Sequence, residues 1–289
     1  MTTQTWIDGL FAGAVYALVA LGLTITFQPT RVMNFAQGEA LVLGAAVGYQ
    51  AISLGRLSWP VALLLAVVLG ALMGVATERM TMLPMRLSGS RFGWIVAALA
   101  VALIAQSLFT LNYSDVDALR PPPFAEGGLE VGGGRIAWQV SLTIGIALAV
   151  TAAYDAFLRH SLYGRALRAA SHSPGTAVLM GIPVQRIVVL SFVISSAVTA
   201  LVGLLAAPVL FIAPTAGLMF TIKGFTAAVI GGVGSPRGAL TGGLIVGFLD
   251  SVVRAEINAT AGNLVVFGLL ALILVVFPAG LFGKPMEAH

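Results

Sequence analysis

The sequence predicts an all-α fold, a polytopic transmembrane helical bundle of about eight or nine membrane segments, some of them short or discontinuous. Of the 289 residues, 58% are apolar and only 9% are charged, and the mean hydropathy is +1.00. A soluble domain is on average about 25% charged, so this composition argues against a water-soluble globule. The 34 glycines stand among Leu, Val and Ala, where small residues allow helices to pack closely in a bilayer.

The individual segments are visible as apolar runs, because a helix needs about 20 mostly apolar residues to cross a bilayer. Seven runs are clear: residues 6–27, 36–54, 59–77, 94–112, 136–158, 187–211 and 264–277. Residues 221–253 are long enough for two crossings but are interrupted by the Gly- and Pro-containing stretch 231–238, which favours a break. We therefore prefer nine segments to eight and expect residues 1–289 to form a single transmembrane domain.

The basic residues predict an orientation, because cytoplasmic loops collect Lys and Arg. With nine segments, ten basic residues fall on one side: Arg31, Arg79, Arg86, Arg91, Arg159, Arg165, Arg168, Arg186, Arg237 and Lys284. Five fall on the other: Arg56, Arg120, Arg135, Lys223 and Arg254. This places the N-terminus outside and the C-terminus in the cytoplasm. Residues 1–5 carry no positive charge, so the first run is expected to be a retained span and not a signal peptide.

Several classes of function find no support in the residues. The net charge is only +4 and the basic residues are scattered, so nucleic acid is not an expected partner. The chain has no cysteine and only three histidines, none with a second ligand at metal spacing. It also lacks a phosphate-binding loop, and no histidine lies in a span to activate Ser195 or Ser196. We expect no catalytic residues, no metal, no cofactor in this chain and no enzyme activity.

Two loops stand out. Residues 113–135 hold the run Pro121-Pro122-Pro123, four acids and two glycine clusters, and predict a solvated connector or stiff spacer. Residues 159–186 mix basic and apolar residues at helical spacing. They predict two short helices separated at Ser173-Pro174-Gly175, because Pro forbids continuation and Gly permits a turn. Such an amphipathic hairpin can lie on lipid or dock into a partner.

Few ionisable residues are expected inside the spans, and Glu39 is the most informative. It follows Asn34 and Gln37 near the cytoplasmic end of the second run. An acid in the first turn of a helix is favoured by the backbone dipole, so a cap or an ion pair is preferred to a direct role in translocation, which stays open. Asp155 and Asp250 each precede an arginine by four residues, a spacing typical of structural helix-end pairs.

This sparse set of charges discriminates between kinds of transporter. An ion-coupled carrier needs ionisable residues deep in its spans, and the predicted span centres are nearly bare. A channel needs a polar or carbonyl-lined pore, and the only candidate for such a pore lining in the sequence is the broken stretch at 231–238. An importer subunit driven by a separate nucleotide-hydrolysing partner fits both the bare centres and the docking hairpin, and is preferred.

Four ordered blocks of sequence resemble the permease subunits of branched-chain amino acid ABC importers. The first is Gly13–Leu18 with Gly22–Thr24 and Met33–Glu39; the second is Tyr163–Ala169 with Ala177–Ile182; the third is Lys223–Ser235; the fourth is Phe277–Gly283. The chain departs from the family at Gln37, where histidine is common, and at Ala98-Leu99-Ala100, where Thr-Ile-Gly is common.

The resemblance implies a permease domain over residues 1–289 in a bacterial inner membrane, working with a second, homologous and distinct permease subunit, two cytoplasmic ATPases that bind ATP, an extracytoplasmic solute-binding protein and membrane lipid. Relatives import branched-chain or other amino acids, urea and short amides, or aromatic acids, so branched-chain amino acids are the first expectation and the others remain alternatives. The implied ATPase-docking residues are Tyr163, Gly164, Arg165, Leu167, Arg168, Met180 and Gly181. Candidates for the translocation pathway or gate are Asn34, Gln37, Glu39, Gly231, Gly232 and Gly234, with packing within one subunit as the alternative for the glycines.

Overall fold

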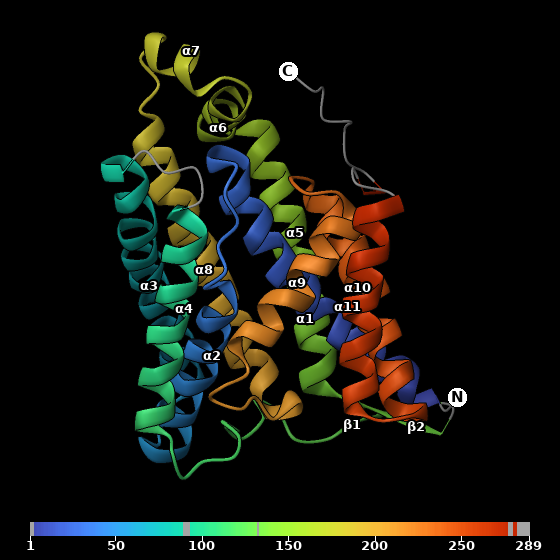
Figure 1. The fold of residues 1–289 in the computed structure, drawn as a ribbon. Helices are drawn as coiled ribbons and strands as arrows, with labels where there is room; N and C mark the ends of the chain where they lie inside the picture. The colour runs from blue at the N-terminus through green and yellow to red at the C-terminus, as the bar shows by residue number, and fades with distance from the viewer. Residues whose placement is uncertain (1–2, 89–92, 132, 277–279, 282–289) are drawn as a thin grey trace. The chain divides into compact units, whose positions relative to one another are not determined.

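The computed structural model describes residues 3–88, 93–131, 133–276 and 280–281, and it is almost entirely helical (Figure 1). The long helices are α1 (Thr3–Thr30), α3 (Trp59–Ser88), α4 (Gly93–Asn112), α5 (Trp138–His160), α8 (Val184–Leu210), α10 (Pro236–Glu256) and α11 (Ala259–Val276). The shorter elements are α2 (Gln37–Gly48) continued by the π-helix η1 (Tyr49–Leu54), α6 (Leu162–His172), α7 (Pro174–Leu179), α9 (Gly217–Gly231) and the strands β1 (Gly128–Val131) and β2 (Gly134–Ala137).

The predicted membrane segments are confirmed. The seven long helices are long and apolar enough to cross a membrane. α2 with η1 accounts for the predicted run 36–54, and the run 221–253 divides into α9 and α10. The division has a local cause, because Gly232 and Gly234 adopt positive φ angles of 93° and 94° and Ser235 caps α10 by accepting from the Gly238 N–H.

The connector at 113–135 is only partly irregular. β1 and β2 form an antiparallel hairpin in which Leu129 pairs with Ile136 and Glu130 with Arg135. No strand was expected here, so the sequence interpretation as a spacer was incomplete. The predicted block Phe277–Gly283, together with Lys284 and His289, lies mostly outside the described residues.

The chain contacts divide into two compact units, and the chain passes from one to the other within α1, α5 and α9 and between Pro122 and Pro123. One unit, called here the terminal unit, comprises Met1–Thr24, Pro123–Ala152 and Ile222–His289; the other, the central unit, comprises Ile25–Pro122 and Ala153–Thr221. A single domain over 1–289 therefore stays a prediction.

Close approaches of helix backbones hold the central unit together. α8 packs against α2 and α3 at glycines: a Cβ added to Gly44 or Gly203 would overlap the backbone of the facing helix, and so would one at Gly74. Because small residues at a crossing permit this approach, the abundance of glycine in the sequence has a direct structural use.

In the terminal unit, α10 packs against the first part of α1 in the same manner. A Cβ at Gly243 would overlap Ala17, and one at Gly247 would overlap Gly13. α11 packs on the other side of α10, and its exposed residues are apolar, Leu264, Leu272 and Val275 among them, as a surface in contact with lipid requires.

Candidate functional site

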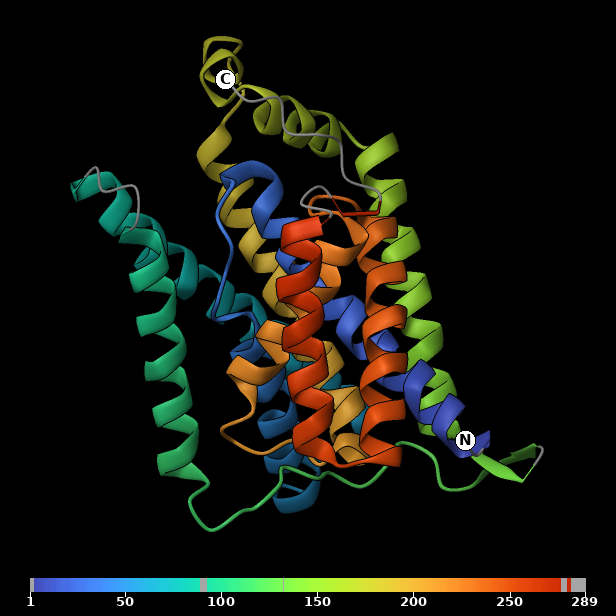
Figure 2. The same cartoon turned by 45° about the vertical axis from the view of Figure 1, so that its right-hand side comes forward.

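The predicted hairpin is present in the central unit as α6 and α7, which link the end of α5 to the start of α8 (Figure 2). Ser161 caps α6 by accepting from the Gly164 N–H at 2.8 Å. α6 ends at Ser173, and Pro174 occupies the first turn of α7, where its missing N–H costs nothing. The break is therefore where the sequence predicted it.

The two sides of the hairpin differ in exposure. Gly164, Leu167 and Ala170 are buried along one side of α6, and a Cβ at Gly164 would crowd the carbonyls of Phe157 and Leu158. Leu167 is only 6% exposed, so it packs within its own unit and is not available as an exposed anchor. This corrects the expectation that Leu167 itself meets a partner.

The outer side of the hairpin is basic and apolar. Arg165, Arg168 and Gly181 are exposed, Tyr163 is 56% exposed, and Met180 is 77% exposed. Leu179 beside it is 87% exposed. Large apolar side chains at such exposure mark a surface that contacts something other than water.

A second candidate region lies where α2 begins. Residues 31–36, between α1 and α2, form no regular helix or strand. Val32 packs against Met82 and Val188, near one end of α3 and α8. Gln37 contacts Ser195 and Thr199, near the middle of α8. α2 thus begins at about half the depth of α8 (Figure 1), not near the cytoplasmic end of a full span as the sequence had suggested. Irregular backbone at such depth is tolerated only inside protein or beside a water-filled cavity.

Gln37 is buried and fully partnered. Its amide nitrogen donates to the Thr199 hydroxyl and to the Ser195 carbonyl, and its oxygen accepts from the Ser195 hydroxyl at 2.9 Å and from the Asn34 amide at 3.1 Å. These bonds join α2 to α8, and the Ser195 hydroxyl thus bonds across helices. The structure thus gives Asn34 and Gln37 a packing role.

Glu39 differs from its neighbours. Its side chain is 0% exposed, and in the part of the chain that the structure describes neither carboxylate oxygen has a hydrogen-bond partner. Glu39 does lie in the first turn of α2, as expected, but the expected hydrogen-bonded cap or ion pair is wrong for the described residues. Arg31, eight residues earlier, donates instead to the Ser171 carbonyl at 2.9 Å.

The start of α9 lies against the start of α2, within the central unit. The Gly38 N–H donates to the Thr221 hydroxyl at 2.8 Å, and a Cβ at Gly38 would overlap the Gly217 carbonyl. A Cβ at Gly217 would overlap the Glu39 carboxylate. The first turns of two helices thus meet at Glu39.

The other pathway candidates, Gly231, Gly232 and Gly234, belong to the terminal unit. Gly231 lies against Gly238, where a Cβ on either would overlap the other's backbone. Gly232 and Gly234 form the turn between α9 and α10. Both contacts lie within this chain, and a role of these glycines in the pathway or gate stays a prediction.

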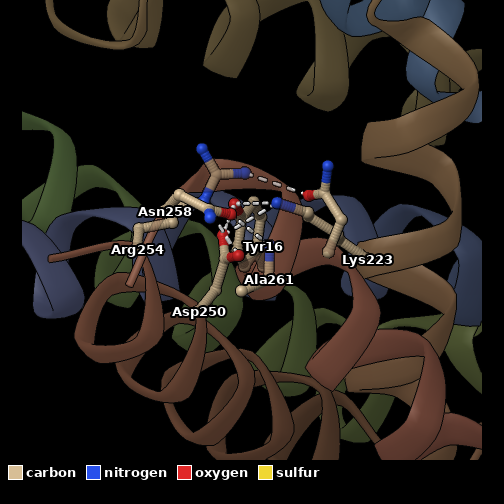
Figure 3. A network of polar contacts seen from close by, with 7 residues as sticks. Tyr16, Lys223, Asp250, Arg254, Asn258 and Ala261 are labelled. Carbon is tan, nitrogen blue, oxygen red and sulfur yellow. Dashed lines mark hydrogen bonds and ion pairs between the residues drawn. The ribbon is translucent and has the colours of Figure 1, made fainter. Parts of the chain in front are cut away.

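A buried ionic network in the terminal unit was missed (Figure 3). Lys223, assigned by sequence to an outside loop, lies within α9, 2% exposed, and its Nζ is 2.8 Å from Asp250 Oδ2. The Tyr16 hydroxyl donates to the same oxygen at 2.6 Å, and Arg254 donates to Oδ1 at 2.9 Å. The predicted Asp250–Arg254 pair is confirmed, as is Asp155–Arg159 at 3.2 Å.

The network corrects the view that the segment centres are nearly bare. One sequence signal could have revealed it: Ile222, Phe225 and residues 227–230 are apolar, which is unusual beside a loop lysine. No cluster of metal-binding residues occurs within the described ranges, and His160 and His172 are exposed at the hairpin.

Comparisons with known proteins bear on these features. The family model described as "Branched-chain amino acid transport system / permease component" matches residues 5–276. The chain is 32% identical to the high-affinity branched-chain amino acid transport system permease protein LivH of Escherichia coli K12, over 98% of this chain and 96% of LivH. It is 31% identical to the corresponding permease protein BraD of Pseudomonas aeruginosa, with the same coverage.

A solved structure shares the fold. PsaBC from Streptococcus pneumoniae in complex with Fab superposes with a TM-score of 0.55 at 14% identity, covering 95% of this chain and 92% of the matched chain. At this identity the likeness concerns the arrangement of helices alone.

Proposed function

The chain belongs to the family of permease components of branched-chain amino acid transport systems, and from this premise we propose that it is the transmembrane subunit of a binding-protein-dependent ABC importer that moves branched-chain amino acids into the cell. One observation carries the proposal: the identity to LivH and BraD extends over nearly the full length of all three proteins.

The energy for transport comes from outside this chain. A permease of this family works with an ATPase and with a solute-binding protein. We expect two cytoplasmic ATPase subunits that bind ATP, a second permease subunit that is homologous and distinct, and an extracytoplasmic binding protein, with no cofactor held by this chain itself.

The outer side of the α6–α7 hairpin is the proposed ATPase contact. Tyr163 and Met180 supply exposed apolar area, and Arg165 and Arg168 supply positive charge for acidic groups of the ATPase. Gly164 and Leu167 are buried and hold the hairpin in place, and Gly181 turns the chain out of α7 with a φ of 77°. Anchoring to anionic lipid is a second use of the same arginines.

The protein is a multi-pass membrane permease, for which we propose the bacterial inner membrane. The proposed orientation has the N-terminus outside and the C-terminus in the cytoplasm. Removing buried Lys223 from the loop residues leaves ten basic residues on the proposed cytoplasmic side and, from five less one, four on the other, which supports this orientation.

Uptake of radiolabelled leucine and urea in cells, with and without the partner ATPase, tests the proposal. We expect leucine uptake that disappears without the ATPase. Urea uptake without leucine uptake would favour the importers of urea and short amides, and aromatic acids are tested in the same way. Leucine uptake that survives loss of the ATPase but disappears with the ion gradient would indicate a secondary carrier, and passive flux would indicate a channel; family membership favours neither.

A further inference from the structure

The central unit contains a buried carboxyl group that none of its described side chains pairs with. Glu39 is in the first turn of α2, is 0% exposed, and accepts no hydrogen bond from any residue that the structure describes. Burying a carboxylate without a partner is costly, by several kcal/mol. A buried carboxyl group without a hydrogen-bond partner is therefore a candidate for binding a ligand.

The neighbouring polar residues show that this is a local exception. Asn34 and Gln37 precede Glu39 by five and two residues; Asn34 donates to Gln37, and Gln37 bonds to Ser195 and Thr199 of α8. Thr221 bonds to the Gly38 N–H. Hydrogen bonds thus connect α2 to α8 and to α9, and Glu39 contributes none of them.

The helix starts around Glu39 are suited to an anionic side chain. The starts of α2 and α9 meet beside the carboxylate, and the positive ends of helix dipoles stabilise an anion there. The closest basic residue in sequence, Arg31, is bonded to Ser171, and the Arg120 guanidinium stacks at 4.1 Å over the Phe211 ring. A bound cation with several N–H donors would therefore meet no competition from the side chains of Arg31 and Arg120.

We propose that Glu39 binds the α-ammonium group of the transported amino acid at about the middle of the membrane. The proposal rests on the proposed function, which supplies a zwitterionic cargo. A half-length helix starting at mid-depth is a recurrent element of substrate sites in transporters, and α2 has this form. Because a neutral amide lacks both the charge and the acceptor capacity of a carboxylate, Glu39→Gln removes the interaction without changing the side-chain shape.

Access to Glu39 requires the starts of α2 and α9 to separate, because the carboxylate is fully covered as the helices stand. Gly38 and Gly217 form the crossing, and the Thr221 hydroxyl accepts from the Gly38 N–H across it. The proposal therefore requires this crossing to open during the transport cycle.

The test is the number of leucine molecules moved per ATP hydrolysed by the complete transporter in proteoliposomes, with leucine-loaded binding protein outside. A lost charged hydrogen bond predicts a fall of about tenfold in this ratio for Glu39→Gln. The matched control is Glu78→Gln, which neutralises another buried glutamate of the central unit while keeping an acceptor for Gln185, now at 2.8 Å; its ratio is expected to stay within about twofold of the wild type.

The outcomes separate the two proposals. A wild-type transporter that moves no leucine would contradict the proposed function. Wild-type uptake together with a Glu39→Gln ratio equal to that of Glu78→Gln would overturn the role of Glu39 alone, as would a parallel fall of uptake and ATP hydrolysis that leaves the ratio unchanged. If Glu39→Gln does not assemble, Glu39→Asp, which withdraws the carboxylate by one methylene, is measured against the same control, and an unchanged ratio contradicts the proposal.

Discussion

The buried network around Asp250 predicts an unequal response to removal of its two charged partners. Asp250 accepts from Tyr16, Lys223 and Arg254, whereas Lys223 contacts only Asp250 and the Tyr16 hydroxyl within the network. Asp250→Asn therefore leaves the Lys223 ammonium, 2% exposed, without a counter-charge. Lys223→Met leaves the Asp250 carboxylate with two donors, one of them the cationic Arg254.

The magnitudes follow from this difference. An uncompensated buried charge costs about 3–5 kcal/mol, so Asp250→Asn is expected to lower the unfolding midpoint of the purified protein in detergent by on the order of 10 °C. Lys223→Met is expected to cost about 1–3 kcal/mol. The double variant Lys223→Met with Asp250→Leu removes both charges and is expected to be more stable than Asp250→Asn.

Thermal unfolding followed by tryptophan fluorescence measures all three variants. Equal losses for the two single variants, or a double variant no more stable than Asp250→Asn, would refute the assignment of Lys223 and Asp250 as a coupled pair. The complete pairing of the network indicates a structural role, so leucine transport by a correctly folded double variant is expected to be retained.

Other predictions concern the hairpin and the α2–α8 contact. Arg168→Glu is expected to abolish leucine uptake in cells at unchanged membrane abundance. The control variant Arg135→Glu, in the β-hairpin, is expected to keep leucine uptake. Normal uptake by the Arg168 variant would contradict the docking assignment. Gly44→Leu is expected to lower the free energy of unfolding by more than about 3 kcal/mol, since its side chain would overlap the α8 backbone. The control Gly145→Leu, where a Cβ meets nothing within 4 Å, should leave the melting temperature unchanged. Equal melting temperatures of the two variants would be inconsistent with this packing. Gln37→Leu removes the hydrogen-bond partner of buried groups on α8 and is expected to lower the free energy of unfolding by about 2–4 kcal/mol. A variant with the wild-type midpoint of thermal unfolding would contradict this α2–α8 contact.

Length and apolar content were sufficient to predict the membrane segments, because the bilayer sets a minimum length for a helix. The break at Gly232–Ser235 and the hairpin break at Ser173 were also predictable, since Gly and Pro act through local backbone geometry. These features depend on residues that are neighbours in the sequence.

The depth at which α2 begins was not predictable in the same way. Residues 31–35 lie between two predicted runs, and only the contacts of Val32 and Gln37 with α8 show that this stretch extends along about half of α8 without forming a helix. The pairing of Lys223 with Asp250 likewise joins residues 27 positions apart, and Gln37 joins Ser195 across 158. Hydropathy averages over a window and contains no information on such pairs.

Leucine accumulation in proteoliposomes, with ion gradients collapsed by ionophores, tests the importer most directly. The complete transporter with loaded binding protein is expected to accumulate leucine against its gradient only when ATP is present on the ATPase side, and a complex with hydrolysis-deficient ATPases is expected to accumulate none. Accumulation that needs an ion gradient and ignores ATP would contradict an ATP-driven permease.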